Sequence, residues 1–267
     1  MKRLKNRYRY PVILLKQLVK TDFKLRYQGS VLGYAWSLLR PLAMFVILYV
    51  VFAKFFRLGD AIPSFPIYLL VGIVLWNYFA EVTSNSINSI VGRGDILRKI
   101  NFPKYVIVLA GSISALINLF LNCLIIILFM LVAGVEISVS ILWVPLLLVE
   151  LFVLSLALSF FLSALFVRFR DVNYIWEVLI QGAFYLTPIL YPLSLVPEKY
   201  AKLLMLNPVA QIIQDIRHAV VTPKTMTLHS SYNTWLIYLV PLSIIAGCTL
   251  LSIKYFRARS KHFAEEV

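Results

Sequence analysis

The feature that most constrains the fold is a series of long apolar runs, each close to the roughly 20 residues that an α-helix needs to cross a bilayer. Lipid cannot hydrogen-bond to backbone groups, so such runs favour membrane-spanning helices, whose backbone bonds are internal. We predict an all-α integral membrane protein with six transmembrane helices, the fifth interrupted by Gln181, Thr187 and Pro188. The predicted spans are Val31–Phe52, Phe65–Ser86, Tyr105–Val132, Ile141–Val167, Tyr174–Leu193 and Trp235–Tyr255.

Composition supports one membrane domain and no sizeable soluble one. Of 267 residues, 61% are hydrophobic and 14% are charged, whereas soluble domains carry about a quarter charged residues. We expect the membrane domain at 31–255, after a cytoplasmic segment at 1–30 and before a tail at 256–267. Cys123 and Cys248 lie in apolar runs, which favours packing over a disulfide or a metal site. No signal-peptide pattern follows the basic start, so we expect it to be uncleaved.

The positive charges predict the orientation. A net charge of +14 could indicate nucleic-acid binding, but the distribution of Lys and Arg follows the alternation of the spans. With the N-terminus inside, the cytoplasmic segments carry all of them except Lys54, Arg57, Lys199, Lys202, Arg217 and Lys224. The positive-inside rule therefore places both termini in the cytoplasm.

A short basic island, Ile90–Lys104, separates the second and third spans. Gly92 and Gly94 permit a sharp turn, and Pro103 disfavours helix before it. We expect a helix at about 92–102, lying across the cytoplasmic membrane surface. It is either an ordinary charged loop or a docking helix for a soluble partner. Its candidate contact residues are Arg93, Gly94, Asp95, Ile96, Leu97, Arg98 and Lys99.

The segment Pro11–Tyr27 has apolar residues at helical spacing and a basic opposite face, which predicts an amphipathic helix at the membrane interface. It either anchors the first span or helps to dock a partner. Its polar-face candidates are Lys16, Lys20, Lys24, Arg26 and Tyr27.

The long outer segment 191–233 exceeds ordinary loop lengths, which indicates a functional or re-entrant element. It contains two short apolar stretches, Tyr200–Leu206 and Val209–Ala219, separated by Asn207 and Pro208. Asn followed by Pro is a helix stop and start signal. We expect a pair of short outer helices within about 194–222.

Charged residues within the predicted spans are functional candidates, because burying them in lipid is costly. Arg40 could bind a phosphate through two parallel hydrogen bonds; alternatively it reaches the inner interface or pairs with Glu177. Glu81 and Glu150 are explained by span-end placement or pairing at least as well as by a proton relay.

Aromatic residues cluster in the first and fifth spans. They form either interfacial belts or stacking surfaces for the apolar faces of sugar rings. The candidates for such a path are Tyr34, Trp36 and Tyr49, then Tyr174, Trp176, Phe184 and Tyr185.

The sequence offers no sign of catalysis. It lacks the phosphate-binding G-x-x-x-x-G-K-[ST] and the H-E-x-x-H and G-x-S-x-G motifs. We expect a chain that is not an enzyme and holds no cofactor or metal. If the chain takes part in ATP-driven transport, a separate polypeptide must bind the ATP and Mg²⁺.

Several motifs together carry a family resemblance: D-F-K-L-R-Y-Q-G-S-V-L-G-Y-A-W at 22–36, G-R-G-D-I-L-R-K-I-N-F-P-K at 92–104, R-F-R-D-V at 168–172 and L-N-P at 206–208. With this order of segments, nearly the whole chain resembles the membrane subunit of type-2 ATP-binding-cassette exporters of lipid-linked polysaccharides, the group that exports O-antigen, capsule and wall teichoic acid.

The resemblance implies a homodimer in the bacterial inner membrane, bound to two copies of a separate ATPase. Gly94–Lys99 would match the family's coupling helix, and Lys16–Tyr27 its interface helix. The first and fifth spans would line the glycan channel, and the helices around Asn207 and Pro208 would form the outer gate. Alternatives are an ATP-binding-cassette exporter of a drug or small lipid, an autonomous secondary transporter and, more distantly, a membrane glycosyltransferase.

Overall fold

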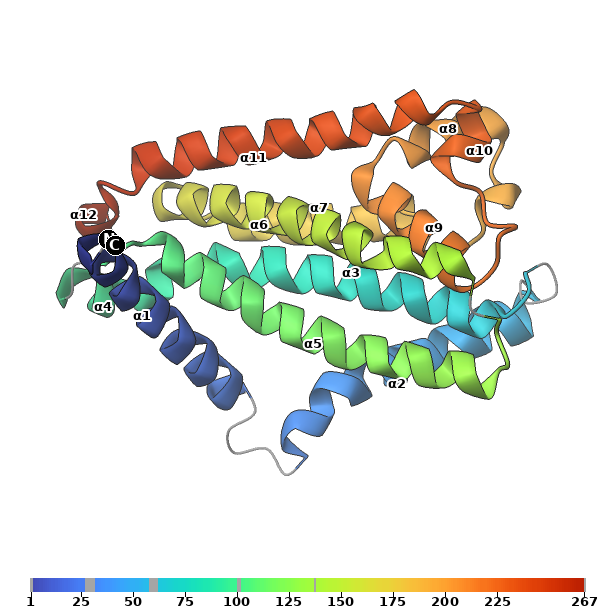
Figure 1. Cartoon of the computed structure of the whole chain (residues 1–267), viewed down its shortest axis with the longest axis horizontal. Helices are drawn as coiled ribbons and strands as arrows, with labels where there is room; N and C mark the ends of the chain where they lie inside the picture. The colour runs from blue at the N-terminus through green and yellow to red at the C-terminus, as the bar shows by residue number, and fades with distance from the viewer. Residues whose placement is uncertain (1, 27–31, 58–61, 100–101, 137, 267) are drawn as a thin grey trace.

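The computed structural model describes residues 2–26, 32–57, 62–99, 102–136 and 138–266. Over these residues the regular structure is helical, as the sequence predicts, and the long helices lie roughly side by side along one axis (Figure 1).

Within the part of the chain that the structure describes, five helical segments are long and apolar enough to cross a membrane. Three begin or end in irregular turns: α2 (Trp36–Tyr49) continues through a wider helical turn at Val50–Phe55, and short 3-10 turns precede α6 (Val144–Arg168) and α11 (Leu239–Arg259). The five segments are Trp36–Phe55, Phe65–Ile87 (α3), Tyr105–Val132 (α5), Val139–Arg168 and Trp235–Arg259.

The remaining predicted span is shorter than expected. Helix α7 covers Val172–Leu186, and its 15 residues reach about 22 Å at 1.5 Å per residue, against a hydrocarbon thickness of about 30 Å. The helix ends because Pro188 disfavours helical backbone at Thr187, which is extended. Five of the six predicted spans thus coincide with full-length candidates, whereas the fifth coincides with a helix too short to be one.

Helix α3 forms the centre of the bundle. It packs against α2, α5, α6, α7 and α9, and 78% of its most apolar stretch is buried, compared with 6% for α2. Such extensive burial suits the largely apolar sequence of α3, which Asn77, Glu81, Ser84 and Asn85 interrupt. Helix α2 lies at the edge, so its surface is available to lipid or to another subunit.

One end of the bundle carries α1 (Lys2–Arg26), α4 (Gly94–Lys99) and α12 (Phe263–Glu266) (Figure 1). Helix α1 runs obliquely along α5. The sequence predicted basic or charged tails at both chain ends, but α1 is helical from Lys2, and Phe263 is fully buried against Phe256 with ring centroids 5.4 Å apart. Burial of that aromatic ring explains why the C-terminal segment folds back.

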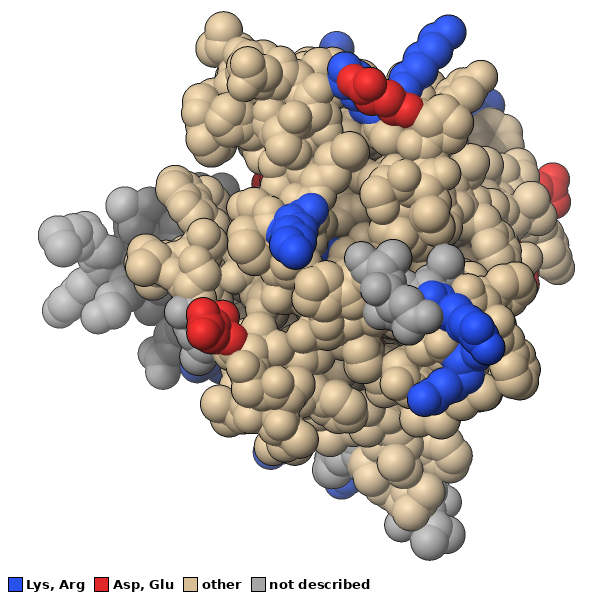
Figure 2. All heavy atoms as spheres, turned by 90° about the vertical axis from the view of Figure 1, so that its right-hand side faces the viewer, with Lys and Arg blue, Asp and Glu red and all other residues tan. Residues whose placement is uncertain are grey.

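The opposite end carries α8 (Glu198–Met205), α9 (Pro208–Val220) and α10 (Leu228–Tyr232). Figure 2 shows this end face, where a few Lys, Arg, Asp and Glu side chains stand among mostly uncharged ones.

Candidate functional site

A groove of about 890 Å³ lies between α2, α3 and α5. Its lining is polar for a surface built by membrane helices. Arg40 and Trp36 come from α2, and a carboxylate, amides and hydroxyls come from the other helices. The main polar lining residues are Ser37 and Arg40 of α2, Asn77, Tyr78, Glu81, Ser84 and Asn85 of α3, and Asn118 and Asn122 of α5.

Amide side chains join the three walls. Asn122 Nδ2 lies 2.8 Å from the backbone oxygen of Asn118 and 3.4 Å from that of Ser37. Asn118 Nδ2 in turn donates to Glu81 Oε1 at 3.3 Å. The contact with Ser37 places the start of α2 beside the middle of α5 (Figure 1). Arg40 therefore lies well within the length of the bundle rather than at its end.

Two buried groove atoms have no hydrogen-bond partner among the described residues: the Tyr78 hydroxyl oxygen and Asn118 Oδ1. An unsatisfied buried polar group costs about 1–3 kcal/mol, and native proteins rarely leave one without water or ligand. The groove thus offers a hydroxyl, amides, a guanidinium and an indole to a ligand rich in hydroxyl groups.

The other predicted path residues are distributed over different surfaces. Tyr49 stacks on Phe45 with centroids 5.8 Å apart. Trp176 Nε1 donates to Thr83 Oγ1 at 3.3 Å, and the Phe184 ring meets Trp76 at 5.9 Å. The side chain of Tyr34 lies outside the described residues.

Tyr174 and Tyr185 of α7 are 70% and 69% exposed. Helix α7 packs against α3 and α6, whereas α2 packs against α3 and α5. Among the described residues, the aromatic rings of α2 and α7 therefore make no direct ring contact with each other. The pairing of Arg40 with Glu177 is also not formed within the described residues, because Glu177 lies on α7 and Arg40 in the groove.

At the end of the bundle that carries α1 and α12, the predicted docking helix α4 follows a 3-10 turn at Val91–Arg93. Leu97 is buried in an apolar cluster with Ile90, Phe102 and Phe263, which holds the short helix against the bundle. Asp95 and Arg98 are exposed. The side chains of Ile96 and Lys99 lie outside the described part of the chain.

An ion pair links the segment before α4 to α1. Arg93 Nη2 contacts Asp22 Oδ1, and the two side chains are 22% and 19% exposed. Lys16, Lys20 and Lys24 of α1 are exposed, as predicted for a polar face, whereas the side chain of Arg26 and all of Tyr27 are outside the described residues. Residues distant in sequence thus connect the two predicted docking elements.

The predicted glycine turn is not used. Gly94 has helical backbone angles, with φ −53° and ψ −41°, and Gly92 is not among the described glycines with positive φ. The chain changes direction through a 3-10 turn that other residues can also form.

The outer helix pair is present. Asn207 begins α9 by accepting a hydrogen bond from the backbone N–H of Val209 at 3.0 Å, and Pro208 occupies the first turn, which needs no N–H donor. Except for Asp215 and His218, every residue of α9 is buried. The helix packs against α3, α6 and α11, so it is inserted into the bundle rather than laid on its surface.

Arg217 holds this inserted helix in place. Its side chain is completely buried and donates to three backbone oxygens: Nε to Tyr68 at 2.9 Å, Nη1 to Pro188 at 2.5 Å and Nη2 to Ile189 at 2.6 Å. The guanidinium also lies 3.6 Å from the centroid of the Tyr68 ring. It satisfies the carbonyls left unpaired where α7 ends. The sequence-based count used Arg217 only as a positive charge of the outer side, and its complete burial was not predicted.

Asp215, on the same helix, lies in a polar cluster. Its carboxylate accepts from Gln211 Nε2 at 2.7 Å and from the Tyr238 hydroxyl at 3.2 Å, and Glu150 of α6 is beside Gln211. Burial raises the pKa of Asp215 to about 6, although the hydrogen bonds from Gln211 and Tyr238 act in the opposite direction. Glu150 is thus part of a carboxyl cluster at the end of the bundle that carries α8, α9 and α10.

This pKa predicts a pH dependence. Because the folded-state pKa lies above the ordinary value of 3.8, raising the pH from about 4 to 6 removes a proton that the folded state favours, and stability falls in that window. Asp215→Asn should remove this contribution and raise the melting temperature at about pH 7.5 more than at about pH 5. Thermal unfolding in detergent measures both. An equally steep pH dependence in the variant would contradict the assignment.

Comparison with known proteins identifies the family of the chain. Residues 13–221 match the family model described as ABC-2 type transporter. The chain belongs to the ABC-2 type transporter family.

The matched ABC-2 region contains α2 to α9 and most of α1, so it includes the groove, α4 and Arg217. The chain is 30% identical to the O-antigen export system permease protein RfbA of Klebsiella pneumoniae, over 91% of this chain and 92% of that protein. It is 30% identical to an RfbA of Myxococcus xanthus, over 77% and 79%. It is 22% identical to the polysialic acid transport protein KpsM of Escherichia coli, over 78% and 81%.

The comparisons do not assign single residues. Asn118, Asn122 and Tyr78 were missed by sequence reasoning, although the spacing of polar residues contained a signal. Asn77, Glu81 and Asn85 are four residues apart, as are Asn118 and Asn122, which places each set on one face of its helix.

Proposed function

We propose that this chain is the transmembrane subunit of an ATP-driven exporter of a lipid-linked polysaccharide in the bacterial inner membrane. The observation that carries the proposal is the polar groove with Trp36 and Arg40, found in an ABC-2 chain whose relatives are named for O-antigen export and polysialic acid transport. The substrate class could be an O-antigen, a capsule polymer or a teichoic acid.

The groove chemistry suits a sugar polymer on a phosphate-containing carrier. Amides such as Asn77 and Asn85 can exchange hydrogen bonds with hydroxyl groups, and Trp36 can stack on a sugar ring. Arg40 can hold a phosphate through two parallel hydrogen bonds. Because these groups are spread along the groove, a chain can move from one set to the next without one tight site.

The exposed polar side chains of the groove are an argument for a homodimer. Arg40, Ser84 and Asn85 are exposed in the single chain, and in a bilayer these polar groups would face hydrocarbon at considerable cost. A second copy would cover them. The exposed aromatics of α7 would then face the partner's α2, forming the aromatic path that one copy lacks.

The other helices have roles that fit such an exporter. With α7 completed by the segment through Leu193, the chain crosses the membrane six times and has both termini in the cytoplasm. Helix α4 docks on a separate ATPase, which binds ATP and Mg²⁺, and α1 serves as an interface helix. The α8–α9 pair around Asn207 and Pro208 forms the outer gate.

The ion pair between Arg93 and Asp22 gives a test of the link between α1 and α4. Reversing either charge alone should lower transport-coupled ATP hydrolysis, whereas Asp22→Arg combined with Arg93→Asp should restore part of it. For a pair in direct contact, the effect of the double variant should differ from the sum of the two single effects by a coupling energy of about 0.5–3 kcal/mol. A double-mutant cycle measures this value, and strictly additive effects would show that the pair does not link the helices.

Co-purification tests the proposed function. The chain is expressed with its chromosomal neighbours in native lipid and purified through a tag on this chain alone. We expect an ATPase subunit in equal amount, with hydrolysis stimulated by lipid-linked glycan. A chain that purifies alone and moves solute down an ion gradient would instead establish a secondary transporter. Stimulation by a drug or small lipid, without any by glycan, would reassign the substrate.

A further inference from the structure

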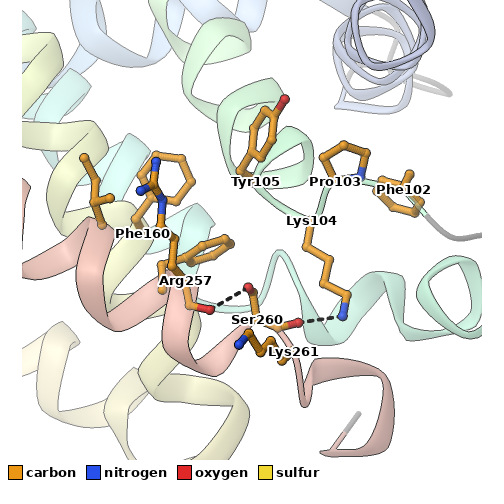
Figure 3. A pocket seen from close by; sticks show the side chains of 10 residues that line it. Phe102, Pro103, Lys104, Tyr105, Phe160, Arg257, Ser260 and Lys261 are labelled. Carbon is orange, nitrogen blue, oxygen red and sulfur yellow. Dashed lines mark hydrogen bonds between the residues drawn. The ribbon is translucent and has the colours of Figure 1, made fainter. Parts of the chain in front are cut away.

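A separate pocket of about 480 Å³ opens at the α4 end of the bundle, between the start of α5, Phe160 of α6 and the last turns of α11 (Figure 3). Helices α11 and α2 lie on opposite sides of the bundle (Figure 1). The pocket is therefore distinct from the groove between α2, α3 and α5.

The deeper wall of the pocket is apolar. Phe160 and Phe256 meet edge to face with centroids 4.9 Å apart, and Ile253 lies one helical turn from Arg257 on α11. Phe102, Pro103 and Tyr105 complete the side formed by the start of α5. These groups provide a hydrophobic slot within the membrane-facing part of the helices.

The rim is cationic. Lys104 precedes α5 and Lys261 follows α11, whereas the guanidinium of Arg257, in the last turn of α11, extends toward Phe160 (Figure 3). The described lining residues include no Asp or Glu. Lys104 Nζ donates to the backbone oxygen of Ser260 at 2.5 Å (Figure 3), which leaves two of its three N–H groups. Nearby Arg259 does not line the pocket and pairs with Glu266 at 3.7 Å.

The positions of the cations and of the apolar slot along the helices match those of a phospholipid's head group and acyl chains. Lys104 directly precedes α5 and Ser260 directly follows α11, and both helices are candidate spans. The cations therefore lie at the level of the head groups, and the apolar slot lies on the hydrocarbon side. The N-terminus of α5 has no side-chain cap, so its positive dipole end adds to the attraction for an anion.

We propose that this pocket binds one anionic phospholipid of the cytoplasmic leaflet. Its phosphate lies near Lys104 and Lys261 at the Ser260 end of the pocket, Arg257 adds positive charge farther along the wall, and an acyl chain packs against Phe160, Ile253 and Phe256. Basic pockets between membrane helices on the cytoplasmic side are suited to anionic head groups. The assignment of the leaflet rests on the orientation in the proposed function. The bound lipid bridges the start of α5, which follows α4, to the end of α11.

The test uses the purified complex, stripped of lipid in detergent and titrated with phosphatidylglycerol while bound lipid is counted by native mass spectrometry. We expect one saturable site per chain. A variant with Lys104, Arg257 and Lys261 changed to Gln should bind about 100-fold more weakly, since each cation contributes about 1 kcal/mol, or about fivefold. The matched control changes the exposed Arg168, Arg170 and Lys254 to Gln and should retain binding.

Ile253→Trp provides a second variant that fills the slot without changing charge, and it should also weaken binding. Phosphatidylcholine and inorganic phosphate should not compete. Equal binding by the rim variant, an equal loss in the control, or competition by free phosphate would overturn the proposal. Stronger competition by a polyprenyl pyrophosphate would show a substrate site instead. None of these results depends on export, so they leave the proposed function to its own test.

Discussion

Arg217→Met should strongly reduce the amount of folded protein in the membrane. Methionine fills much of the space but donates no hydrogen bond, so it leaves the oxygens of Pro188 and Ile189 without the donors that Arg217 supplies. Each unsatisfied buried group costs about 1–3 kcal/mol, and α9 loses its connection to the end of α7. Fluorescence-detected size-exclusion chromatography and thermal unfolding in detergent measure the loss.

Gly72 gives an independent test of the same contact. A Cβ atom at this position would lie 2.2 Å from Arg217 Nη2, a separation that atoms cannot adopt. Gly72→Ala should therefore lower the melting temperature, although alanine is normally the better residue in a helix. The matched controls are Gly111→Ala and Gly247→Ala, whose Cβ atoms would meet nothing within 4 Å.

The variant that combines Gly72→Ala with Arg217→Met tests whether the two residues act through the same contact. Since the Arg217→Met substitution removes the rigid guanidinium beside position 72, Gly72→Ala should cost less in that background, which makes the two effects non-additive. A melting temperature for Gly72→Ala equal to that of Gly111→Ala would show that Arg217 does not need this glycine.

Asp95→Ala combined with Arg98→Ala should abolish export while the chain still inserts and folds. Both side chains are exposed on α4, whereas Leu97 on the same helix is buried and anchors it. Removal of the two exposed side chains changes the surface proposed to dock on the ATPase and leaves the buried Leu97 in place. Export is measured as surface glycan in cells, and folding as the chromatographic profile of the purified chain.

The control removes one acidic and one basic side chain far from the docking surface. Glu136 follows α5 and Lys224 follows α9, and both side chains are exposed. Replacing both by Ala changes the same number of acidic and basic groups outside the proposed gate helices and should leave export near normal, because exposed substitutions usually change stability by about 0.5 kcal/mol or less. Normal export by the α4 variant would refute its docking role.

The elements fixed by local patterns are predictable from the sequence. The span Tyr105–Val132 has the predicted bounds, and Phe65–Ile87 differs by one residue, because continuous apolar runs define the hydrocarbon length. The break at Asn207 and Pro208 follows from cap and proline chemistry in the same way. These signals lie within a few neighbouring residues.

Long-range contacts account for what the sequence did not reveal. In the sequence Arg217 is one more outer positive charge, and only the fold brings it to Pro188 and Ile189. Phe263 belongs to an expected tail until its packing against Phe256 is seen. The path aromatics of α2 and α7 were expected together, but α3 separates them, so their meeting requires a surface that one chain does not contain.

Within the site, a single unusual residue was easier to identify from the sequence than a group of residues that share a groove. Arg40 was identified because an arginine in an apolar run is uncommon, and the groove contains it. The amides of α5 were not identified, since Asn118 and Asn122 interrupt an otherwise apolar span only mildly. Their importance comes from sharing a groove with Glu81 of α3 and Ser37 of α2.

Reconstituted transport tests the central claim most directly. The chain and its ATPase are placed in vesicles with the cytoplasmic side outward, and a labelled lipid-linked glycan is added with ATP and Mg²⁺. We predict that the glycan becomes protected inside the vesicles only when ATP is hydrolysed, and that Arg40→Gln slows this step without preventing assembly. Protection that proceeds equally without ATP, or ATP-dependent transport that never includes the glycan, would contradict the account.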